Sequence, residues 1–205
     1  MNKHKLPEQG HPLLIILSGP SGVGKDAVVS RMRSLGKPFR IAVTATTRLR
    51  RSHETDGIDY YFRDKAAFQK MLIDKEFLEW AEVYGNLYGT PRSQIKKALE
   101  SGIDVVVKTD VQGAFSIRKI VEEAVFIFLA PPNMEELSQR LKQRMTESPD
   151  ALRLRLKTAE SEMKEADKFD HIVVNYEGKL DDAVVEIEKI AASEHKRMPK
   201  RRVQL

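Results

Sequence analysis

A glycine-rich segment between a short apolar run and a helical pattern constrains the fold more than any other part of the sequence. Residues 13–17, Leu-Leu-Ile-Ile-Leu, are typical of a buried strand, and residues 26–35 have the pattern of a helix. Between them stands Ser-Gly-Pro-Ser-Gly-Val-Gly-Lys-Asp, which contains the spacing G-x-x-x-x-G-K. In this strand–loop–helix context the spacing predicts a phosphate-binding loop.

The predicted loop would bind phosphate mainly through its backbone. Its glycines let successive N–H groups turn inward, the helix that follows adds its dipole, and Lys25 can reach the β- and γ-phosphates of a nucleotide. An ordinary glycine-rich turn is the alternative, and the spacing of the glycines and the lysine argues against it. The predicted loop residues are Gly19, Pro20, Ser21, Gly22, Val23, Gly24, Lys25 and Asp26.

Asp26 departs from the usual form of this motif. The residue after the lysine is usually Ser or Thr, whose hydroxyl binds Mg²⁺. A carboxylate is also a hard oxygen ligand that Mg²⁺ accepts. Asp26 is therefore the candidate magnesium ligand.

Further apolar runs predict the rest of the core. They lie at residues 39–43, 103–107, 124–129 and 171–174, with helical patterns at 112–121 and 180–193. Apolar runs that alternate with helices predict an α/β fold with a parallel five-stranded core sheet flanked by helices. We expect a single domain over residues 1–205, with its core at about 11–43, 95–134 and 167–195.

Two stretches do not follow this rhythm. Residues 44–94 are polar and aromatic, and they predict a small mixed α/β insert with a helix at 64–73, for which Asp64 is a plausible N-cap. Residues 135–166 consist almost entirely of helix formers and predict a helical, charged appendage.

Composition excludes several classes of protein. The chain has no cysteine, which removes disulfides, thiolate nucleophiles and cysteine-ligated zinc. Its longest apolar run is too short to cross a bilayer, and no secretory signal is visible, so a cytoplasmic protein with no membrane partner is the expectation.

The net charge is +5, and the last eleven residues contain five Lys or Arg and no acid. The rest is formally neutral, so we expect no specific nucleic-acid partner and a solvated basic tail at residues 196–205.

The insert contains side chains that suit a phosphate monoester. Arg48 and Arg51 lie three residues apart and can clamp such a group through paired hydrogen bonds. Tyr60 and Tyr88 can add phenolic donors. Glu79 is a lone acid in an apolar segment, and from the alternation alone a solvent-facing strand residue is the favoured interpretation.

Four segments together resemble the guanylate kinase family: GPSGVGK, TATTRLRRSHETDGIDYYF, EWAEVYGNLYGTP and DVQGA. They occur in family order, and the resemblance covers about residues 13–190. It implies the P-loop nucleoside monophosphate kinase fold, in which the insert binds GMP and the helical appendage is a lid. The implied activity, part of nucleotide recycling, is ATP-dependent phosphorylation of GMP, and of dGMP, to GDP. The implied cofactor is Mg²⁺ with ATP, with no organic prosthetic group, and the protein would be a monomer or homo-oligomer.

The resemblance also implies roles for individual residues. The positions that match those around guanine are Thr44, Glu79, Thr90 and Asp110. Guanine presents N–H donors that carboxylates can accept, and adenine lacks that donor edge. The positions around the GMP phosphate are Arg48, Arg51, Tyr60 and Tyr88. Arg144 and Arg155 match the lid arginines that close over ATP, and Asn175 matches a position near the ATP base. The implied catalytic set is Lys25, Arg48, Arg144 and Arg155.

Lys108 is a second departure from the family pattern. Family members often carry an acid two residues before the aspartate of the DVQG segment, which is Asp110 here. We hypothesise that Asp26 takes over the positioning of the metal. Lys108 would then balance Asp26 by pairing with its carboxylate or with a phosphate.

Two other functional classes are compatible with this scaffold. A non-catalytic module of similar fold would recognise protein ligands, but such modules typically have a degraded phosphate loop, whereas Gly24 and Lys25 are present here. A related kinase could act on a different small phosphorylated acceptor, but Glu79 and Asp110 suit guanine specifically. The basic tail could add a nucleic-acid contact to any of these functions.

Overall fold

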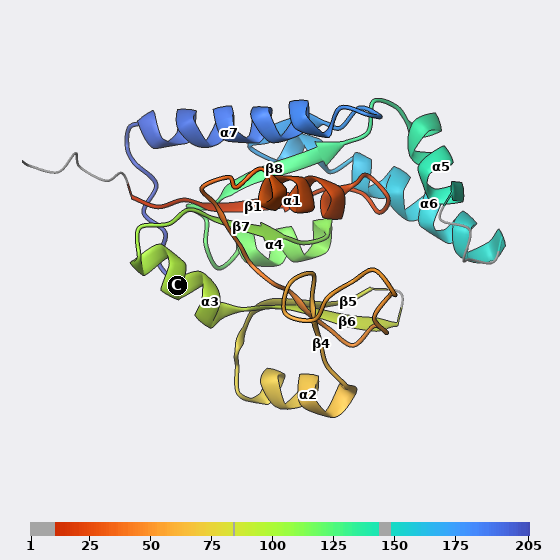
Figure 1. The fold of residues 1–205 in the computed structure, drawn as a ribbon, viewed down its shortest axis with the longest axis horizontal. Coiled ribbons are helices and arrows are strands. Elements are labelled where there is room, and N and C mark those ends of the chain that lie inside the picture. Colours follow the sequence, from red (N-terminus) through yellow and green to blue (C-terminus); the bar gives the residue numbers. More distant parts are fainter. Residues whose placement is uncertain (1–10, 84, 144–148) are drawn as a thin grey trace, which may run out of the picture.

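A computed structural model describes residues 11–83, 85–143 and 149–205 (Figure 1). Its centre is a parallel five-stranded sheet with the strand order β2-β7-β1-β8-β9. The strands are β1 (Leu14–Ser18), β2 (Arg40–Ile41), β7 (Val105–Lys108), β8 (Val125–Ala130) and β9 (His171–Val174). The prediction of a parallel five-stranded core is confirmed.

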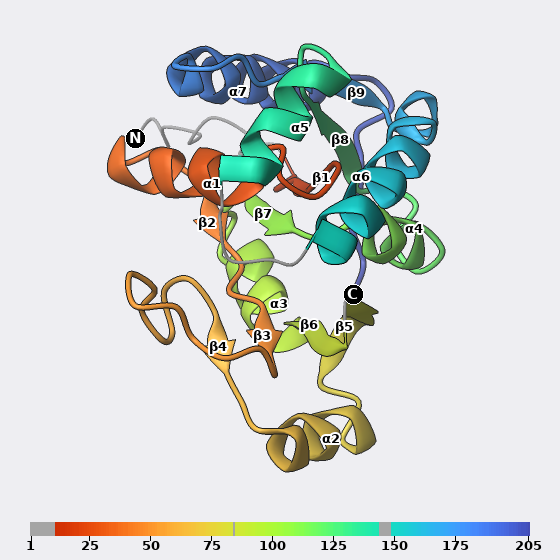
Figure 2. The same ribbon diagram turned by 90° about the vertical axis from the view of Figure 1, so that its right-hand side faces the viewer.

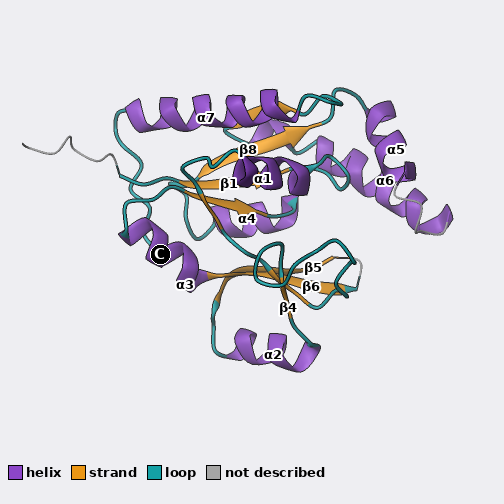
Figure 3. Ribbon diagram, in the orientation of Figure 1, coloured by secondary structure: helices purple, strands orange, loops and turns teal. Residues whose placement is uncertain are grey.

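Helices cover both faces of this sheet, as Figure 3 shows. Helices α1 (Lys25–Ser34) and α7 (Leu180–Lys196) pack on one face together with Ile15 and Leu17 of β1. The opposite face, with Leu14 and Ile16, carries α3 (Arg92–Glu100) and α4 (Val111–Arg118). Alternate residues of β1 are therefore buried in two different layers, which explains why the strand is apolar throughout.

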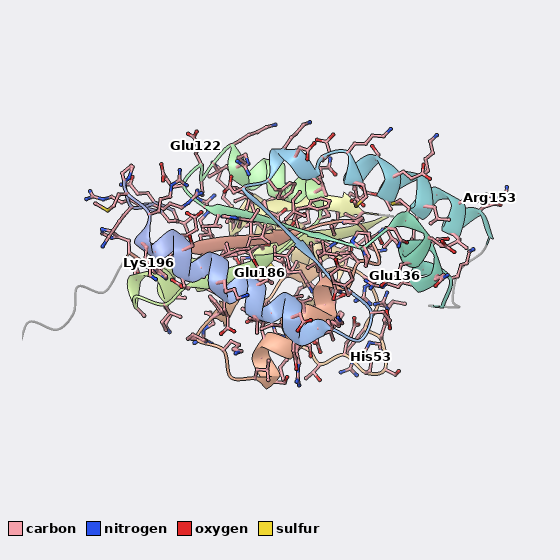
Figure 4. The ribbon with its side chains drawn as sticks, turned by 90° about the horizontal axis from the view of Figure 1, so that it is seen from above. His53, Glu122, Glu136, Arg153, Glu186 and Lys196 are labelled. Carbon is pink, nitrogen blue, oxygen red and sulfur yellow. The ribbon has the colours of Figure 1, made fainter. Side chains whose placement is uncertain are left out.

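Most charged residues of α7 lie on its outer surface, and the buried Glu194 is an exception. Figure 4 looks down on α7, where Glu186 and Lys196 are exposed at the surface. The inner side of the same helix buries Val184 and Ile187 against the sheet. Among the described residues, no helix combines the length and the apolar character that crossing a bilayer needs.

The insert forms a separate small sheet with the order β4-β3-β6-β5, below the core in Figure 1. Its elements are β3 (Ala45–Thr46), β4 (Tyr61–Phe62), α2 (Lys65–Ile73), β5 (Phe77–Val83) and β6 (Asn86–Pro91). The Phe68 and Phe77 rings stack 4.6 Å apart in its own small core. Asp64 caps α2 by accepting a hydrogen bond from the Ala67 N–H at 2.7 Å, so the predicted N-cap is confirmed.

The helical appendage consists of α5 (Met134–Gln143) and α6 (Pro149–Met163), followed by a 3₁₀ turn, η1 (Ala166–Lys168). Figure 1 shows both helices at one end of the core sheet. Leu137, Leu141 and Ala159 of these helices are buried in the same apolar cluster as α1. The appendage is therefore packed onto the helix that follows the phosphate loop.

The junction between core and insert differs from the expectation. The strand predicted at 39–43 is limited to Arg40–Ile41, because the Val43 N–H and C=O pair with the side-chain amide of Gln94 at 2.9 and 2.7 Å. Gln94 belongs to α3, a helix that was not among the elements predicted from the sequence. A side chain thus replaces a neighbouring strand at this point of the backbone.

The prediction of a solvated basic tail holds for Lys196, Arg197, Lys200 and Arg202, which are exposed, but it is wrong for Arg201. Arg201 is only 8% exposed and donates to Glu194 at 2.8 Å, to the Ala124 carbonyl at 2.7 Å and to Asp170 at 3.2 Å. Val203 and Leu205 pack against the apolar cluster on the face opposite α7. The sequence shows the charge of the tail but not that Arg201 will pair with the buried Glu194 and with Asp170.

Replacing Arg201 by Ala should destabilise the fold by about 2–4 kcal/mol, because it leaves two carboxylates and a buried carbonyl without their shared partner. Urea denaturation of the variant measures the effect. Arg202→Ala is the matched control, since Arg202 is exposed. Equal stability of the two variants would show that the tail is not anchored by Arg201.

Candidate active site

A cavity of about 570 Å³ is formed by residues of the core, the insert and the lid. Figure 2, which looks at this end of the molecule, shows α6 above the insert strands. The sequence-predicted residues that line the cavity are Ser21, Lys25, Asp26, Thr44, Arg48, Arg51, Tyr60, Glu79, Tyr88, Asp110 and Arg155. Residues more than a hundred positions apart are therefore brought to one site.

The phosphate loop has the predicted strand–loop–helix form. β1 ends at Ser18 and α1 begins at Lys25. Gly19 has φ +143°, and a Cβ atom there would lie 2.2 Å from the Leu129 carbonyl oxygen, so only glycine fits between the loop and β8. The Lys25 ammonium donates to the carbonyl oxygens of Gly19 at 2.5 Å and Pro20 at 3.1 Å. The loop thus wraps around the lysine that is expected to bind phosphate.

Asn175 supports the loop from beneath. Its side-chain amide donates to the Val23 carbonyl at 2.8 Å, and Arg140 donates to the Val23 and Asn175 carbonyls at 3.2 and 2.8 Å. Asn175 is 4% exposed and does not line the cavity. Its contacts are those of a residue that shapes the loop, and its predicted place near the ATP base stays a prediction. Arg140 was missed because a lone arginine in a charged helix gives no sequence signal.

Glu162 of α6 also meets the phosphate loop, and the sequence did not single it out. Its carboxylate accepts a hydrogen bond from the Ser21 N–H at 3.2 Å. Burial raises the pKa of Glu162, although the nearby Lys25 favours its ionised form. Burial likewise lowers the pKa of Lys25, against the attraction of Glu162 and Asp110. The Glu162 carboxylate thus occupies one of the N–H groups that the sequence predicts to bind phosphate.

Arg48 and Arg51 are held by a buried acid, Glu54, which sequence reasoning also missed. Arg48 pairs with Glu54 at 2.7 Å, and the Arg51 N–H donates to the same carboxylate at 2.8 Å. Burial works against the ionised form of Glu54, but the hydrogen bonds from Arg48 and Arg51 outweigh it and lower its pKa. The Arg48 guanidinium lies 5.3 Å from the centre of the Tyr60 ring. The Arg48 guanidinium is therefore fixed before any anion binds, whereas Glu54 holds Arg51 mainly through its backbone, with the guanidinium 3.8 Å away.

Glu79 lies at the other end of the cavity and is 7% exposed, so the interpretation as a solvent-facing strand residue is wrong. A register shift between Phe77 and Glu79 interrupts the pairing of β5 with β6. Phe77, Leu78 and Glu79 are consequently all buried, because a bulge re-aims the side chains of a strand. Alternation along the sequence cannot reveal such a bulge.

The Glu79 carboxylate is held beneath the N-terminus of α4. The Thr90 hydroxyl donates to it at 2.8 Å, and a Cβ atom on Gly113 would come within 2.9 Å of it. Burial raises the pKa of Glu79 to about 7, although hydrogen bonds from Thr90 and Thr109 favour its ionised form. Thr90 is fully buried and is not part of the cavity wall. Its hydroxyl therefore serves Glu79, whereas a direct contact with guanine had been expected.

Asp110 and Thr44 complete this end of the cavity. Asp110 caps α4 by accepting from the Gly113 N–H at 2.7 Å, and it lines the cavity as well. Thr44 is 6% exposed and lies on the same wall. The site thus presents two carboxylates and a hydroxyl to whatever enters, a set that matches hydrogen-bond donors better than acceptors.

Asp26 and Lys108 form an ion pair, which is one of the two pairings that the hypothesis allowed for Lys108. The Lys108 ammonium also donates to the Tyr60 hydroxyl at 2.9 Å, and that hydroxyl lies 3.3 Å from Asp26. This contact connects the phosphate loop, the end of β7 and the insert.

Of the two predicted lid arginines, Arg155 lines the cavity, and Arg144 lies outside the described residues.

Asp26 is compatible with one part of a magnesium site. Its side chain is 52% exposed and lines the cavity next to the phosphate-loop lysine. No cluster of three or more His, Asp or Glu that could hold a metal occurs in the described part of the chain. Mg²⁺ commonly takes one or two carboxylates and completes its shell with substrate phosphates and water. The residues present fit a metal of that kind, held largely by a bound nucleotide.

Comparison with known proteins agrees with this geometry. The family model for guanylate kinase matches residues 11–194. The guanylate kinase of Desulfitobacterium hafniense is 41% identical over 95% of this chain and 96% of its own length. A chloroplastic/mitochondrial guanylate kinase 2 of Oryza sativa is 44% identical over 95% of this chain and 68% of its own length. The crystal structure of guanylate kinase from Anaplasma phagocytophilum superposes with a TM-score of 0.76 at 30% identity, covering 92% of this chain and 89% of that one. The phosphate loop, the two-carboxylate pocket and these matches together show that the chain belongs to the guanylate kinase family.

Proposed function

We propose that this protein transfers the γ-phosphoryl group of ATP directly to the phosphate of GMP, giving ADP and GDP, and that dGMP is a second acceptor. The observation that supports this most is the single cavity itself. A phosphate loop stands at one side of it, and a guanidinium clamp and two carboxylates stand at the other. Direct transfer needs both substrates in one closed space, and this arrangement supplies it.

The residues divide into a donor side and an acceptor side. On the donor side, the loop amides and Lys25 would hold the β- and γ-phosphates of ATP. On the acceptor side, Arg48, Arg51, Tyr60 and Tyr88 would hold the GMP phosphate and aim one of its oxygens at the γ-phosphorus. No covalent intermediate is required, since phosphoryl transfer depends mainly on positioning and on neutralising charge.

Guanine would be selected by Glu79 and Asp110. Its N1–H and exocyclic amine can donate to the two carboxylates, and Thr44 can donate to an acceptor of the base. Adenine presents an acceptor at N1, where guanine has a donor, and would leave a buried carboxylate unpaired. The preformed hydrogen bond from Thr90 keeps the Glu79 carboxylate in place for this role.

We assign the insert, residues 44–94, to GMP and the lid, residues 135–166, to ATP. Arg155, together with Arg144, would close over the ATP phosphates, and closure would exclude water that could hydrolyse ATP. The lid acid Glu162 must then leave the Ser21 N–H, because the incoming phosphate needs that donor.

Mg²⁺ bound with ATP would neutralise phosphate charge, and Asp26 is the residue that would hold it. Replacing Asp26 by Ala should raise the Mg²⁺ concentration needed for half-maximal rate by about tenfold or more, since one carboxylate ligand is lost. A magnesium titration of the steady-state rate measures this. An unchanged titration curve would remove Asp26 from the metal site.

Replacing Arg48 by Ala should raise the KM for GMP and lower kcat, together by about 100-fold in kcat/KM, because the clamp also aligns the attacking oxygen. Arg50→Ala is the matched control, because Arg50 is exposed and does not line the cavity. Steady-state kinetics with GMP as the varied substrate separates the two variants. Equal kinetics would contradict the assignment of the clamp.

The function itself is tested with a coupled assay of ADP production across GMP, dGMP, AMP, CMP and UMP, with ATP and Mg²⁺. GMP should be the best acceptor, with dGMP second, because no proposed contact depends on the 2′-hydroxyl. Turnover of AMP without turnover of GMP would overturn the substrate assignment.

A further inference from the structure

Lys108 is a second partly buried lysine that lines the cavity beside the phosphate loop. It ends strand β7 and pairs in register with Leu17 of β1, just before the loop begins. Its side chain is 12% exposed, and its ammonium lies 4.1 Å from the centre of the Tyr60 ring. The Lys108 ammonium, Asp26 and the Tyr60 hydroxyl form a closed triangle of contacts.

This triangle lies between the two substrate subsites. Asp26 directly follows Lys25 on the donor side. Tyr60 belongs to the acceptor side, where its ring also carries the Arg48 guanidinium. Two cations thus flank one phenol ring, and each has a carboxylate partner: Glu54 for Arg48 and Asp26 for Lys108.

The Lys108 ammonium has two partners in the site, since it forms an ion pair with Asp26 and donates to the Tyr60 hydroxyl at 2.9 Å. Asp26 is the more accessible partner, since its side chain is 52% exposed against 12% for Lys108. The carboxylate can therefore turn towards solvent while the lysine stays in place.

We propose that Lys108 is a further ligand of the acceptor phosphate, and that its ammonium passes from Asp26 to that phosphate as GMP binds. This inference rests on the proposed function, because it takes GMP as the acceptor. A phosphate dianion beside Lys108 and Arg48 attracts both cations more strongly than one carboxylate attracts Lys108. The exchange also leaves the Asp26 carboxylate ready for the metal that accompanies ATP.

A structural ion pair is the competing explanation. In that case the triangle would only fix the insert against the core. Replacing Lys108 and replacing Asp26 would then change the affinity for GMP in the same direction. The proposed exchange predicts opposite effects, because Asp26 competes with GMP for Lys108. It also predicts that the effect of Lys108 depends on the phosphate of the ligand, whereas a displaced insert would weaken binding of the base as well.

The test is calorimetric titration of GMP and of guanosine in EDTA without ATP, on the wild type and three variants. Lys108→Met should weaken the binding of GMP by about tenfold or more, equivalent to about 1.4 kcal/mol, and leave the affinity for guanosine unchanged. Lys108→Arg should restore GMP affinity to within about threefold, because it returns the charge. Asp26→Asn should bind GMP about threefold tighter or more, because the competing charge is gone.

Arg31→Met and Asp181→Asn are the matched controls, since these residues form an exposed ion pair at 2.5 Å between α1 and α7 and do not line the cavity. Both should leave the GMP affinity unchanged. GMP affinity of Lys108→Met within about twofold of the wild type overturns the inference. The inference is also overturned if Asp26→Asn binds GMP no tighter than the wild type. That result does not depend on whether the lysine variant folds. A wild type that binds no GMP would instead refute the proposed function.

Discussion

Replacing Lys25 by Met should lower kcat by about a thousandfold or more while the affinity for GMP stays within about twofold. Lys25 is the cation that the loop aims at the ATP phosphates, where negative charge must be neutralised as the phosphoryl group moves. GMP would bind at the other side of the cavity, so its affinity should not depend on Lys25. Single-turnover kinetics and a GMP titration measure the two quantities separately.

The same variant should fold at least as stably as the wild type. Burial lowers the pKa of Lys25, which shows that the site disfavours its charge, and Met keeps the length of the side chain. Urea denaturation therefore serves as the control for folding. Near-normal turnover by a folded Lys25→Met protein would contradict the phosphate-loop assignment.

Replacing Glu79 by Gln should lower kcat/KM for GMP by roughly 30- to 1000-fold, because an amide donor would face a donor of guanine. The affinity for ATP should hardly change, since Glu79 lies in the acceptor insert. The ratio of kcat/KM for GMP to kcat/KM for AMP should become smaller as well. GMP kinetics within about twofold of the wild type would leave guanine recognition to Asp110 and Thr44.

Glu79→Gln should also change the pH dependence of stability. Burial raises the pKa of Glu79 from 4.5 to about 7, so between these values the native protein binds more protons than the unfolded chain. Stability from this group is therefore fully present below pH 4.5 and is lost as the pH rises through 7. The variant should gain up to about 3 kcal/mol relative to the wild type between pH 5 and pH 8. Urea denaturation at both pH values checks this, and a pH-independent difference would contradict it.

The core could be predicted because each of its local signals agrees with the tertiary structure. The run at residues 13–17 is apolar on both faces because β1 is buried on both, and Asp64 precedes a helix that needs a cap. The bulge at Glu79, by contrast, depends on pairing with β6 and on α4, which packs against β5. Such pairing is not encoded in the local alternation of residues.

The residues that would face a substrate could be predicted from the sequence, but the residues that hold them in position could not. Motifs identify residues that would face a substrate, such as Lys25 and Arg48. Glu54 supports Arg48 from six positions along the same segment. Arg140 and Glu162 reach the backbone of the phosphate loop from α5 and α6, and no spacing rule connects them to it in advance. The burial of Arg201 was missed for the same reason, because Arg201 finds its acid partners only after folding.

Two carboxylates that accept the donor edge of guanine, the buried Glu79 and the half-buried Asp110, are central to this account. The most direct test compares GMP with inosine monophosphate as acceptor, since inosine monophosphate keeps N1–H and O6 but lacks the exocyclic amine. The account predicts that kcat/KM for inosine monophosphate is lower by about 30-fold or more, because one carboxylate is left without a donor. A kcat/KM within about threefold of that for GMP would contradict recognition by two carboxylates.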